Sequence, residues 1–142
     1  MILNKNLTLS ENQAVTATAI SENVIGWPDN GTPPREGGPI DRNLGSGTPI
    51  PMLMQVVEDF ATLTSLTITL ETSDNADLSS STVMASSGAI PAASLVAGFR
   101  PAFTRFIPDA EMKKYFGLRY TVTGTDATAG KITAAVATEV NT

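Results

Sequence analysis

The feature that most constrains this chain is the alternation of apolar and polar residues along short segments. Residues 66–70 read Leu-Thr-Ile-Thr-Leu, and residues 118–122 read Leu-Arg-Tyr-Thr-Val. Residues 14–20 and 132–138 show the same period of two. Because successive side chains of a strand point to opposite faces, this period predicts half-buried antiparallel strands.

Further strands are predicted from weaker signals. Residues 52–60 are mostly apolar and are typical of a more central strand. Residues 82–86, 93–97 and 102–107 favour additional short strands. Together these segments predict an all-β fold, a jelly roll or β-sandwich of about eight antiparallel strands.

Turn-forming residues separate the predicted strands at residues 74–77, 87–88 and 124–130. One short helical turn is predicted at residues 109–114. There Asp109 can cap the first turn, and two lysines lie at the far end, where they complement the helix dipole. We expect no longer helix.

A long Gly/Pro-rich loop interrupts the pattern at residues 26–49, which hold 6 of the 11 glycines and 5 of the 9 prolines. Loops of this length inside a compact domain are usually functional or disordered. Trp27, the single tryptophan, opens the loop and could be either an interface residue or a core plug. The length of 142 residues predicts one domain, 1–142, with residues 1–11 as a candidate N-terminal arm.

Cysteine and histidine are both absent from the sequence. Their absence excludes disulfides, thiol nucleophiles, catalytic triads that use histidine, and cysteine or histidine metal sites. The segment Ser86–Gly88 does not have a glycine on both sides of its serine, as a nucleophile elbow requires. We therefore expect no enzymatic activity and no cofactor. Asp74, Asn75 and Asp77 could ligate calcium, but a hairpin turn is the favoured interpretation, so we predict no metal site.

The charge distribution is uneven. The net charge is −5, yet five of the nine basic residues lie between Arg100 and Arg119, interleaved with phenylalanine and tyrosine. This basic aromatic segment could be core and rim, a protein interface, or a surface that stacks on single-stranded nucleic acid. The acidic net charge disfavours nucleic acid. The residues that we predict at an interface are Trp27, Arg35, Arg42, Arg100, Arg105, Lys113, Lys114 and Arg119.

No apolar run approaches the length of a membrane span, so we expect no membrane partner. The first residues show neither the apolar core nor the cleavage site of a secretory signal, which predicts synthesis and retention in the cytoplasm.

Three stretches resemble a known family. The first is Asp41–Ile50 followed by Gln55–Phe60. The second is Leu66–Asn75 followed by Ser87–Pro91 and Leu95–Gly98, and the third is Leu118–Ala134. They occur in this order, preceded by the alternating segment Ala14–Ile20. The set resembles the capsid cement, or decoration, proteins of tailed bacteriophages, in particular the Bordetella-phage cement-protein family.

The resemblance implies a jelly-roll protein that binds the outer surface of the phage head. It implies a homo-oligomer, a dimer or trimer, that bridges neighbouring subunits of the major capsid protein without covalent bonds and stabilises the shell against internal DNA pressure. Such a protein is made in the host bacterial cytoplasm and ends on the capsid exterior. The elements expected to face the capsid or a second copy are Gly26–Pro49, Met1–Leu9 and Arg100–Arg119. A carbohydrate-binding jelly roll on the virion surface is the alternative.

Overall fold

The structure is a computed structural model, and it describes residues 3–26, 31–38, 51–101 and 113–137. Within these residues the fold is all-β and every strand pairing is antiparallel, which confirms the all-β, antiparallel part of the predicted fold class. The elements are strands β1 (Leu3–Ala14), β2 (Ala19–Ile20), β3 (Ile25–Gly26), β4 (Met52–Ser73), β5 (Thr82–Pro91) and β6 (Tyr115–Ala137), and one 3-10 turn, η1 (Ala92–Ser94).

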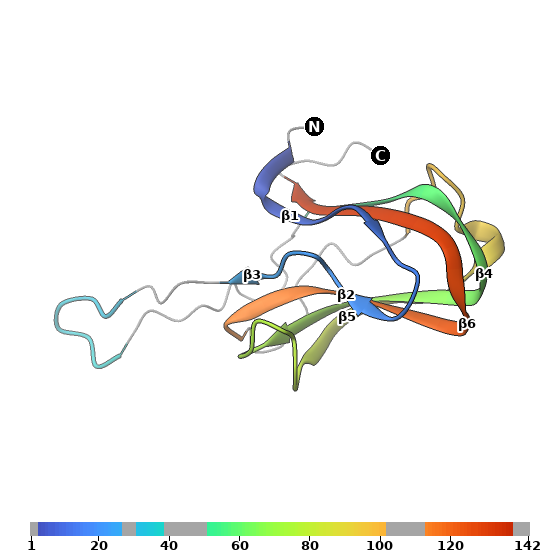
Figure 1. Cartoon of the computed structure of the whole chain (residues 1–142). Helices are drawn as coiled ribbons and strands as arrows, with labels where there is room; N and C mark the ends of the chain where they lie inside the picture. The colour runs from blue at the N-terminus through green and yellow to red at the C-terminus, as the bar shows by residue number, and fades with distance from the viewer. Residues whose placement is uncertain (1–2, 27–30, 39–50, 102–112, 138–142) are drawn as a thin grey trace.

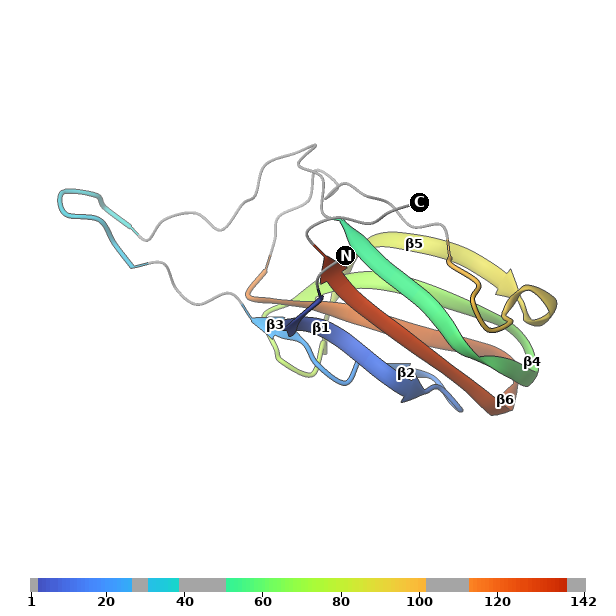
Figure 2. The same ribbon diagram turned by 90° about the horizontal axis from the view of Figure 1, so that it is seen from above.

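A single sheet contains all six strands. Its order is β1-β6-β4-β5, and β2 and β3 also pair with β6. Strands β4 and β6 pair along nearly their whole length, from Met52 opposite Val136 to Ser73 opposite Tyr115. Both strands bend sharply half-way, so the sheet folds over into two facing layers (Figure 1). Seen from above, β1, β6 and β4 run side by side in one layer (Figure 2).

The bend corrects the predicted turn at residues 124–130, because β6 continues through it without ending. The β4–β6 pairing shifts register repeatedly between Val56 and Ser65, as in β-bulges. Gly124 and Gly130 adopt positive φ angles of 92° and 138°, which other residues rarely tolerate. At these glycines β6 therefore bends without reversing direction, and it stays paired with β4.

The same bend changes the strand count. Residues 52–60 and 66–70 are one strand, β4, and residues 118–122 and 132–138 belong to one strand, β6, as far as Ala137. The structure thus has six strands in its described residues where about eight were predicted.

Two other predicted strands differ from the structure. Residues 93–97 form the end of η1 and a following turn. Residues 14–20 are split between β1 and β2, because residues 15–18 pass around the bend of β6. There the Val15 N–H donates to the Gly130 carbonyl, and the Ala127 N–H donates to the Thr16 carbonyl. The predicted strand at 102–107, and the predicted helical turn except for its two lysines, lie outside the described residues.

From Leu3 onward, the candidate N-terminal arm of residues 1–11 is part of strand β1. Leu9 and Ser10 are fully buried in this strand. Leu9 joins the apolar core, so burial of its side chain holds the strand against β6.

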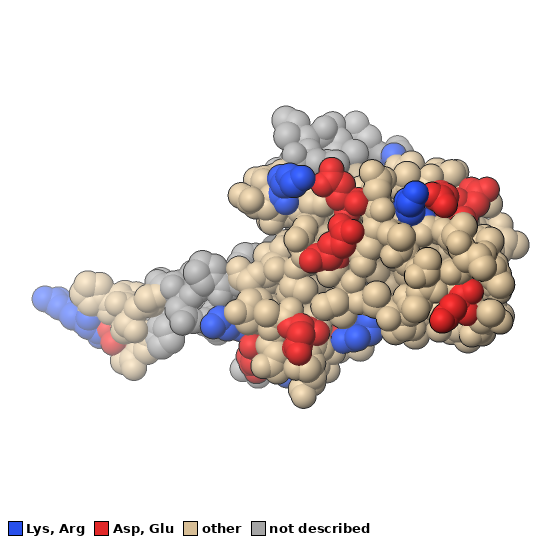
Figure 3. Space-filling view, in the orientation of Figure 1, with Lys and Arg blue, Asp and Glu red and all other residues tan. Residues whose placement is uncertain are grey.

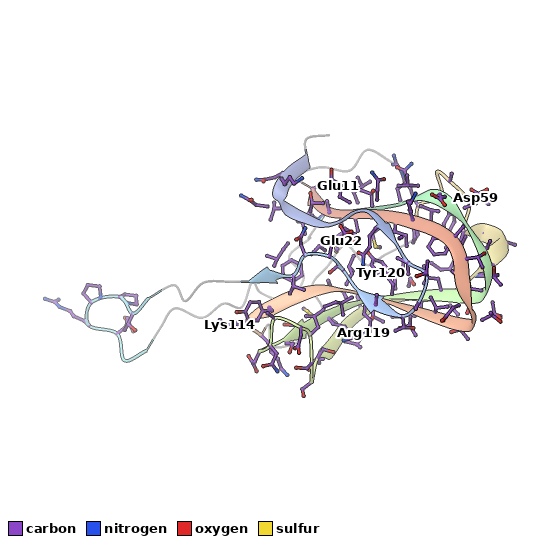
Figure 4. All side chains as sticks on the ribbon, viewed as in Figure 1. Glu11, Glu22, Asp59, Lys114, Arg119 and Tyr120 are labelled. Carbon is purple, nitrogen blue, oxygen red and sulfur yellow. The ribbon has the colours of Figure 1, made fainter. Side chains whose placement is uncertain are left out.

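The apolar core lies between the two layers. The alternating segments place their apolar residues in it as predicted: Leu66, Ile68, Leu70, Leu118, Tyr120, Ile132 and Ala134 are all buried there. Tyr120 lies between the layers, whereas its neighbour Arg119 points to the outer side of the sheet (Figure 4). The period of two therefore determined the buried face of residues 66–70 and 118–122, whereas Leu9 and Ser10 in β1 and residues 71–73 in β4 are buried consecutively.

The described part of the long loop, residues 31–38, lies away from the sheet (Figures 1 and 2). It contains a turn in which the Glu36 N–H donates to the Pro33 carbonyl at 3.1 Å. Arg35 has a φ of 79° in this turn. Among the described residues, no helix is long and apolar enough to cross a membrane.

Candidate interface surfaces

The predicted interface residues fall into different parts of the chain. Trp27, Arg42 and Arg105 are not among the residues that the structure describes. Arg35 is exposed on the outlying turn of residues 31–38, and Arg100 is exposed after the turn that follows η1.

Lys113 and Lys114 directly precede β6. The Lys113 main-chain N–H donates to the Thr72 hydroxyl at 2.9 Å, which ties this segment to the end of β4. The Lys114 ammonium lies 5.6 Å from the centre of the Tyr115 ring, within the range of a cation–π contact. The Tyr115 ring in turn packs over Gly26 in β3, where any Cβ atom would come within 2.8 Å of the ring.

Arg119 is engaged inside the chain. Its Nε donates to both carboxylate oxygens of Glu71, at 3.0 and 2.9 Å, and a terminal nitrogen donates to the Leu78 carbonyl at 3.1 Å. Only 31% of its side chain is exposed. Because Nε and one terminal nitrogen bond within the fold and the side chain is largely buried, Arg119 is a structural residue and a poor candidate for contact with a partner.

Glu71 is the residue that the sequence did not single out. Its carboxylate is buried and also accepts hydrogen bonds from the hydroxyls of Thr69 and Ser81. Glu71 lies two residues from Thr69, and Thr69 is directly opposite Arg119 in the β4–β6 register. The sequence signal for this pair was an acidic residue, Glu71, on the sheet face that also carries Arg119. This signal can be recognised only when the β4–β6 register is known.

The described basic residues do not form one patch. On the face shown in Figure 3, lysine and arginine side chains are separated by acidic and uncharged surface. Lys131 pairs with Glu58 at 2.6 Å, and Lys5 pairs with Glu11 at 3.1 Å. The concentration of basic residues in the sequence thus does not become a single basic surface in the described residues.

Two of the three described aromatic residues of the basic segment, Phe99 and Phe116, join the core or pack against it. Phe116 is 2% exposed, and Phe99 packs against the core while half-buried. No described aromatic side chain is fully exposed, so none offers an open ring on which a sugar could stack. Phe103 and Phe106 lie outside the described ranges.

The acidic segment at residues 74–77 is a turn. Asp77 accepts a hydrogen bond from the Ser79 N–H at 2.9 Å, and hydrogen bonds from Ser79 hold the pKa of Asp77 below its usual value. The Ser73 hydroxyl donates to the Ser79 carbonyl and accepts from the Asn75 N–H. Nowhere in the described residues do three acidic side chains gather to form a metal site.

The edges of the sheet are the remaining candidate surfaces, since unpaired strand edges can take up a further strand. The edge at β1 is covered at residues 8–11. The Leu9 carbonyl accepts from the Asn23 N–H at 2.9 Å, and the Thr8 carbonyl accepts from the Asn23 side chain. The Glu11 N–H donates to the carboxylate of Glu22, which lies beside it (Figure 4).

The free edge of the first half of β4 is also covered. The segment 95–99 runs along it: the Val56 N–H donates to the Phe99 carbonyl, and the Gly98 N–H donates to the Val56 carbonyl. The Asp59 carboxylate accepts from the Ala97 N–H at 2.6 Å and fixes the segment there. Strand β5 forms the other long edge of the sheet.

Comparison with known proteins identifies the family. A family model, Bbp16, matches residues 9–136, from strand β1 to the end of strand β6. The chain belongs to the Bbp16 family. Bbp16 is a name given to a Bordetella phage protein, in agreement with the phage resemblance found in the sequence. No protein of curated function matches the chain.

The match to Bbp16 takes in every strand of the sheet, at least in part. It includes the edge strand β5 and both bends, at 56–65 in β4 and 124–130 in β6. The match therefore spans the whole described sheet.

Proposed function

We propose that this chain is a structural protein of the phage virion, a cement protein that binds the outside of the head and bridges neighbouring subunits of the major capsid protein. The observation that carries the proposal is the match to Bbp16 over residues 9–136. The chain would be made in the host cytoplasm, assemble as a homo-oligomer and bind to the capsid exterior without covalent bonds.

The folded sheet supports a mechanical role. Strands β4 and β6 each pass through both layers, and they remain paired from one end of the sheet to the other. A force applied to one layer is therefore transmitted to the other along two covalent chains, and along a hydrogen-bond ladder that is broken only by the register shifts at the bend. A protein that ties capsid subunits together needs such stiffness, because a soft linker would stretch before the shell did.

Contacts with more than one capsid subunit would make the attachment of the protein to the head strong. A copy that touches two capsid subunits makes its second contact at high effective concentration, so modest individual contacts give strong overall attachment. Low affinity for an isolated capsid subunit is therefore compatible with the proposed role.

We propose no enzymatic activity for the chain. The buried carboxylate of Glu71 is paired with Arg119, and the buried phenol of Tyr120 is hydrogen bonded to Ser10. Both groups stabilise the fold, which is the use expected of buried polar groups in a structural protein.

The long loop and the segment before β6 are the proposed contacts with the capsid or a second copy. Arg35 on the outlying turn and Lys114 beside Tyr115 are exposed cations in these elements. Contacts that use exposed cations weaken as ions screen them, so binding should depend on salt.

The test is to mix the purified protein with phage heads that lack it and to sediment the heads over a series of salt concentrations. We expect the protein to sediment with the heads and to be released progressively as salt rises. Lys114→Ala should reduce binding at low salt, whereas Lys5→Ala, which removes an exposed cation from strand β1, should have a smaller effect. Failure of the wild-type protein to sediment with heads at any salt concentration would rule out the proposal.

A further inference from the structure

The hydrogen-bond ladder between β4 and β6 is irregular at the bend of the sheet. Two pairs of opposite residues border the main interruption: Ala61 with Ala129, and Leu63 with Gly124. Between these pairs β4 contributes a single residue, Thr62, whereas β6 contributes the four residues 125–128. Main-chain pairing is therefore interrupted where both strands pass from one layer into the other (Figure 1).

Thr62 has a backbone conformation that its own side chain disfavours. Its φ is 82°, in the left-handed region. A β-branched residue is a genuine outlier there, because its Cβ and the branches on it crowd the adjoining peptide groups. At two other positions of the bend, Gly124 and Gly130, the chain has glycine, which adopts a positive φ without this strain. Thr62 therefore carries a strain that glycine at the same position would remove.

The side chain of Thr62 forms the link that the main chain lacks. Its hydroxyl lies 2.6 Å from the hydroxyl of Thr128, one of the four residues that β6 places opposite it. Glycine would relieve the strain, but it would lose this hydrogen bond. Both hydroxyls are exposed, so water competes for them and the neighbouring residues must hold the pair in place.

The residues beside the pair anchor it on both strands. Leu63 follows Thr62 and Ala127 precedes Thr128, and both anchoring residues belong to the apolar core. The Ala127 N–H also donates to the Thr16 carbonyl at 2.8 Å, which connects this part of β6 to the segment between β1 and β2. A strained conformation persists only where its surroundings fix it, and these contacts meet that condition.

We propose that Thr62 and Thr128 form a strained latch that keeps the bend of the sheet closed. The latch spans the interrupted ladder and restrains residues 125–128, which have only Thr62 opposite them in β4. The hydrogen bond between the two hydroxyls offsets the strain at Thr62, so its loss favours local opening of the bend. The latch acts within the chain and does not depend on what the protein binds.

Hydrogen exchange of the full chain tests the latch, with the Ala127 amide as the reporter. Opening of the bend exposes little surface, so in low urea this amide should exchange at a rate that hardly depends on urea concentration. Thr128→Val removes one hydroxyl and leaves Thr62 in place, and we expect it to speed this exchange about threefold, as for the loss of a cross-strand threonine pair. Thr123→Val removes a hydroxyl from β6 outside the interruption, and it should leave the rate unchanged.

Substitutions of Thr62 separate the hydrogen bond from the strain. Thr62→Val loses the hydroxyl and keeps the strain, so it should speed exchange of the Ala127 amide as Thr128→Val does, and it replaces that variant if the latter does not fold. Thr62→Gly loses both the hydroxyl and the strain, and it should therefore unfold at a higher urea concentration than Thr62→Val. Adding Thr128→Val to Thr62→Gly should not change the exchange rate further, because no hydroxyl pair is left to break.

Three results would overturn the inference. Exchange of the Ala127 amide that rises with urea as steeply as global unfolding would show that the bend does not open by itself. An unchanged rate in Thr128→Val, or an equal increase in Thr123→Val, would show that the hydroxyl pair does not hold the bend. A Thr62→Gly variant that unfolds at the same or a lower urea concentration than Thr62→Val would show that Thr62 carries no strain. These measurements use no phage heads, so they leave the proposed cement function as it stands.

Discussion

At the scale of single residues, the most informative group is the buried carboxylate of Glu71. Burial of a charged group is costly unless it is paired and hydrogen bonded. Arg119, Thr69 and Ser81 together supply those partners, and Arg119 also reaches the Leu78 carbonyl. The ion pair thus joins β4, β6 and the turn between β4 and β5 at one point.

Breaking this pair should cost stability because the remaining partner is left buried. We expect Glu71→Gln and Arg119→Gln each to lower the free energy of unfolding by about 1–3 kcal/mol. The double variant should lose clearly less than the sum, and urea denaturation measures all three. The exposed pair Lys5 and Glu11 is the matched control, and its removal should change little. Additive losses at Glu71 and Arg119 would contradict the coupling.

A second buried polar group is the phenol of Tyr120. Its oxygen lies 2.8 Å from the Ser10 hydroxyl, which also donates to the Gln13 side chain at 2.6 Å. Gln13 donates in turn to the Ile20 carbonyl. This chain of hydrogen bonds connects β1 and β2 to β6, so it fixes the position of β1 against the core.

Burial raises the pKa of Tyr120 well above its usual value. Above about pH 10 the unfolded chain releases the phenol proton while the folded chain keeps it, so the unfolded state binds fewer protons. Stability should therefore fall as pH rises above about 10, by about 1.4 kcal/mol per pH unit from this group.

The variant Tyr120→Phe should lose about 1 kcal/mol at neutral pH but show less of the alkaline decline. Urea denaturation at several pH values measures both effects. Parallel curves for the wild type and the variant would contradict a raised pKa at this site.

At the scale of elements, the bends in β4 and β6 give the sheet its shape. The sequence around residues 124–130 contains the glycine and aspartate of a turn, and such composition is as typical of a bulge as of a chain reversal. Only pairing with β4 shows that the strand continues. Strand β1 was missed for a different reason: Leu7 and Leu9 do alternate with polar residues, but the pattern is short and lies at the terminus.

Gly130 is the residue on which the bend of β6 depends most. Its φ is 138°, and a Cβ atom there would overlap the Phe60 ring. We expect Gly130→Ala to lower the free energy of unfolding by about 2–4 kcal/mol, from backbone strain and overpacking together. Gly37→Ala is the matched control, because it lies in open space without a positive φ, and it should have little effect. Urea denaturation of the two variants makes the comparison, and equal stabilities would contradict this role for Gly130.

At the scale of the whole molecule, the two layers should behave as one cooperative unit. Strands β4 and β6 belong to both layers, and one core lies between them, so neither layer can unfold without exposing the other. We expect one unfolding transition in urea, with coincident midpoints by far-ultraviolet circular dichroism and by tyrosine fluorescence. Two separated transitions would show that the layers unfold independently.

The sequence by itself determined that the protein is all-β and which face of residues 66–70 and 118–122 is buried. Both follow from the period of two, which is a local property that every tertiary arrangement must satisfy. It also determined the family resemblance, since the order of the stretches is written along the chain.

Only the tertiary structure decided that the predicted strands on either side of each bend are continuous, that Arg119 is bound to Glu71, and that β5 is the last strand of the described sheet. Each of these depends on the register between segments far apart in sequence. Register is set by packing of the whole core, because a shift of one residue would turn every buried side chain outward. No local sequence pattern specifies this register.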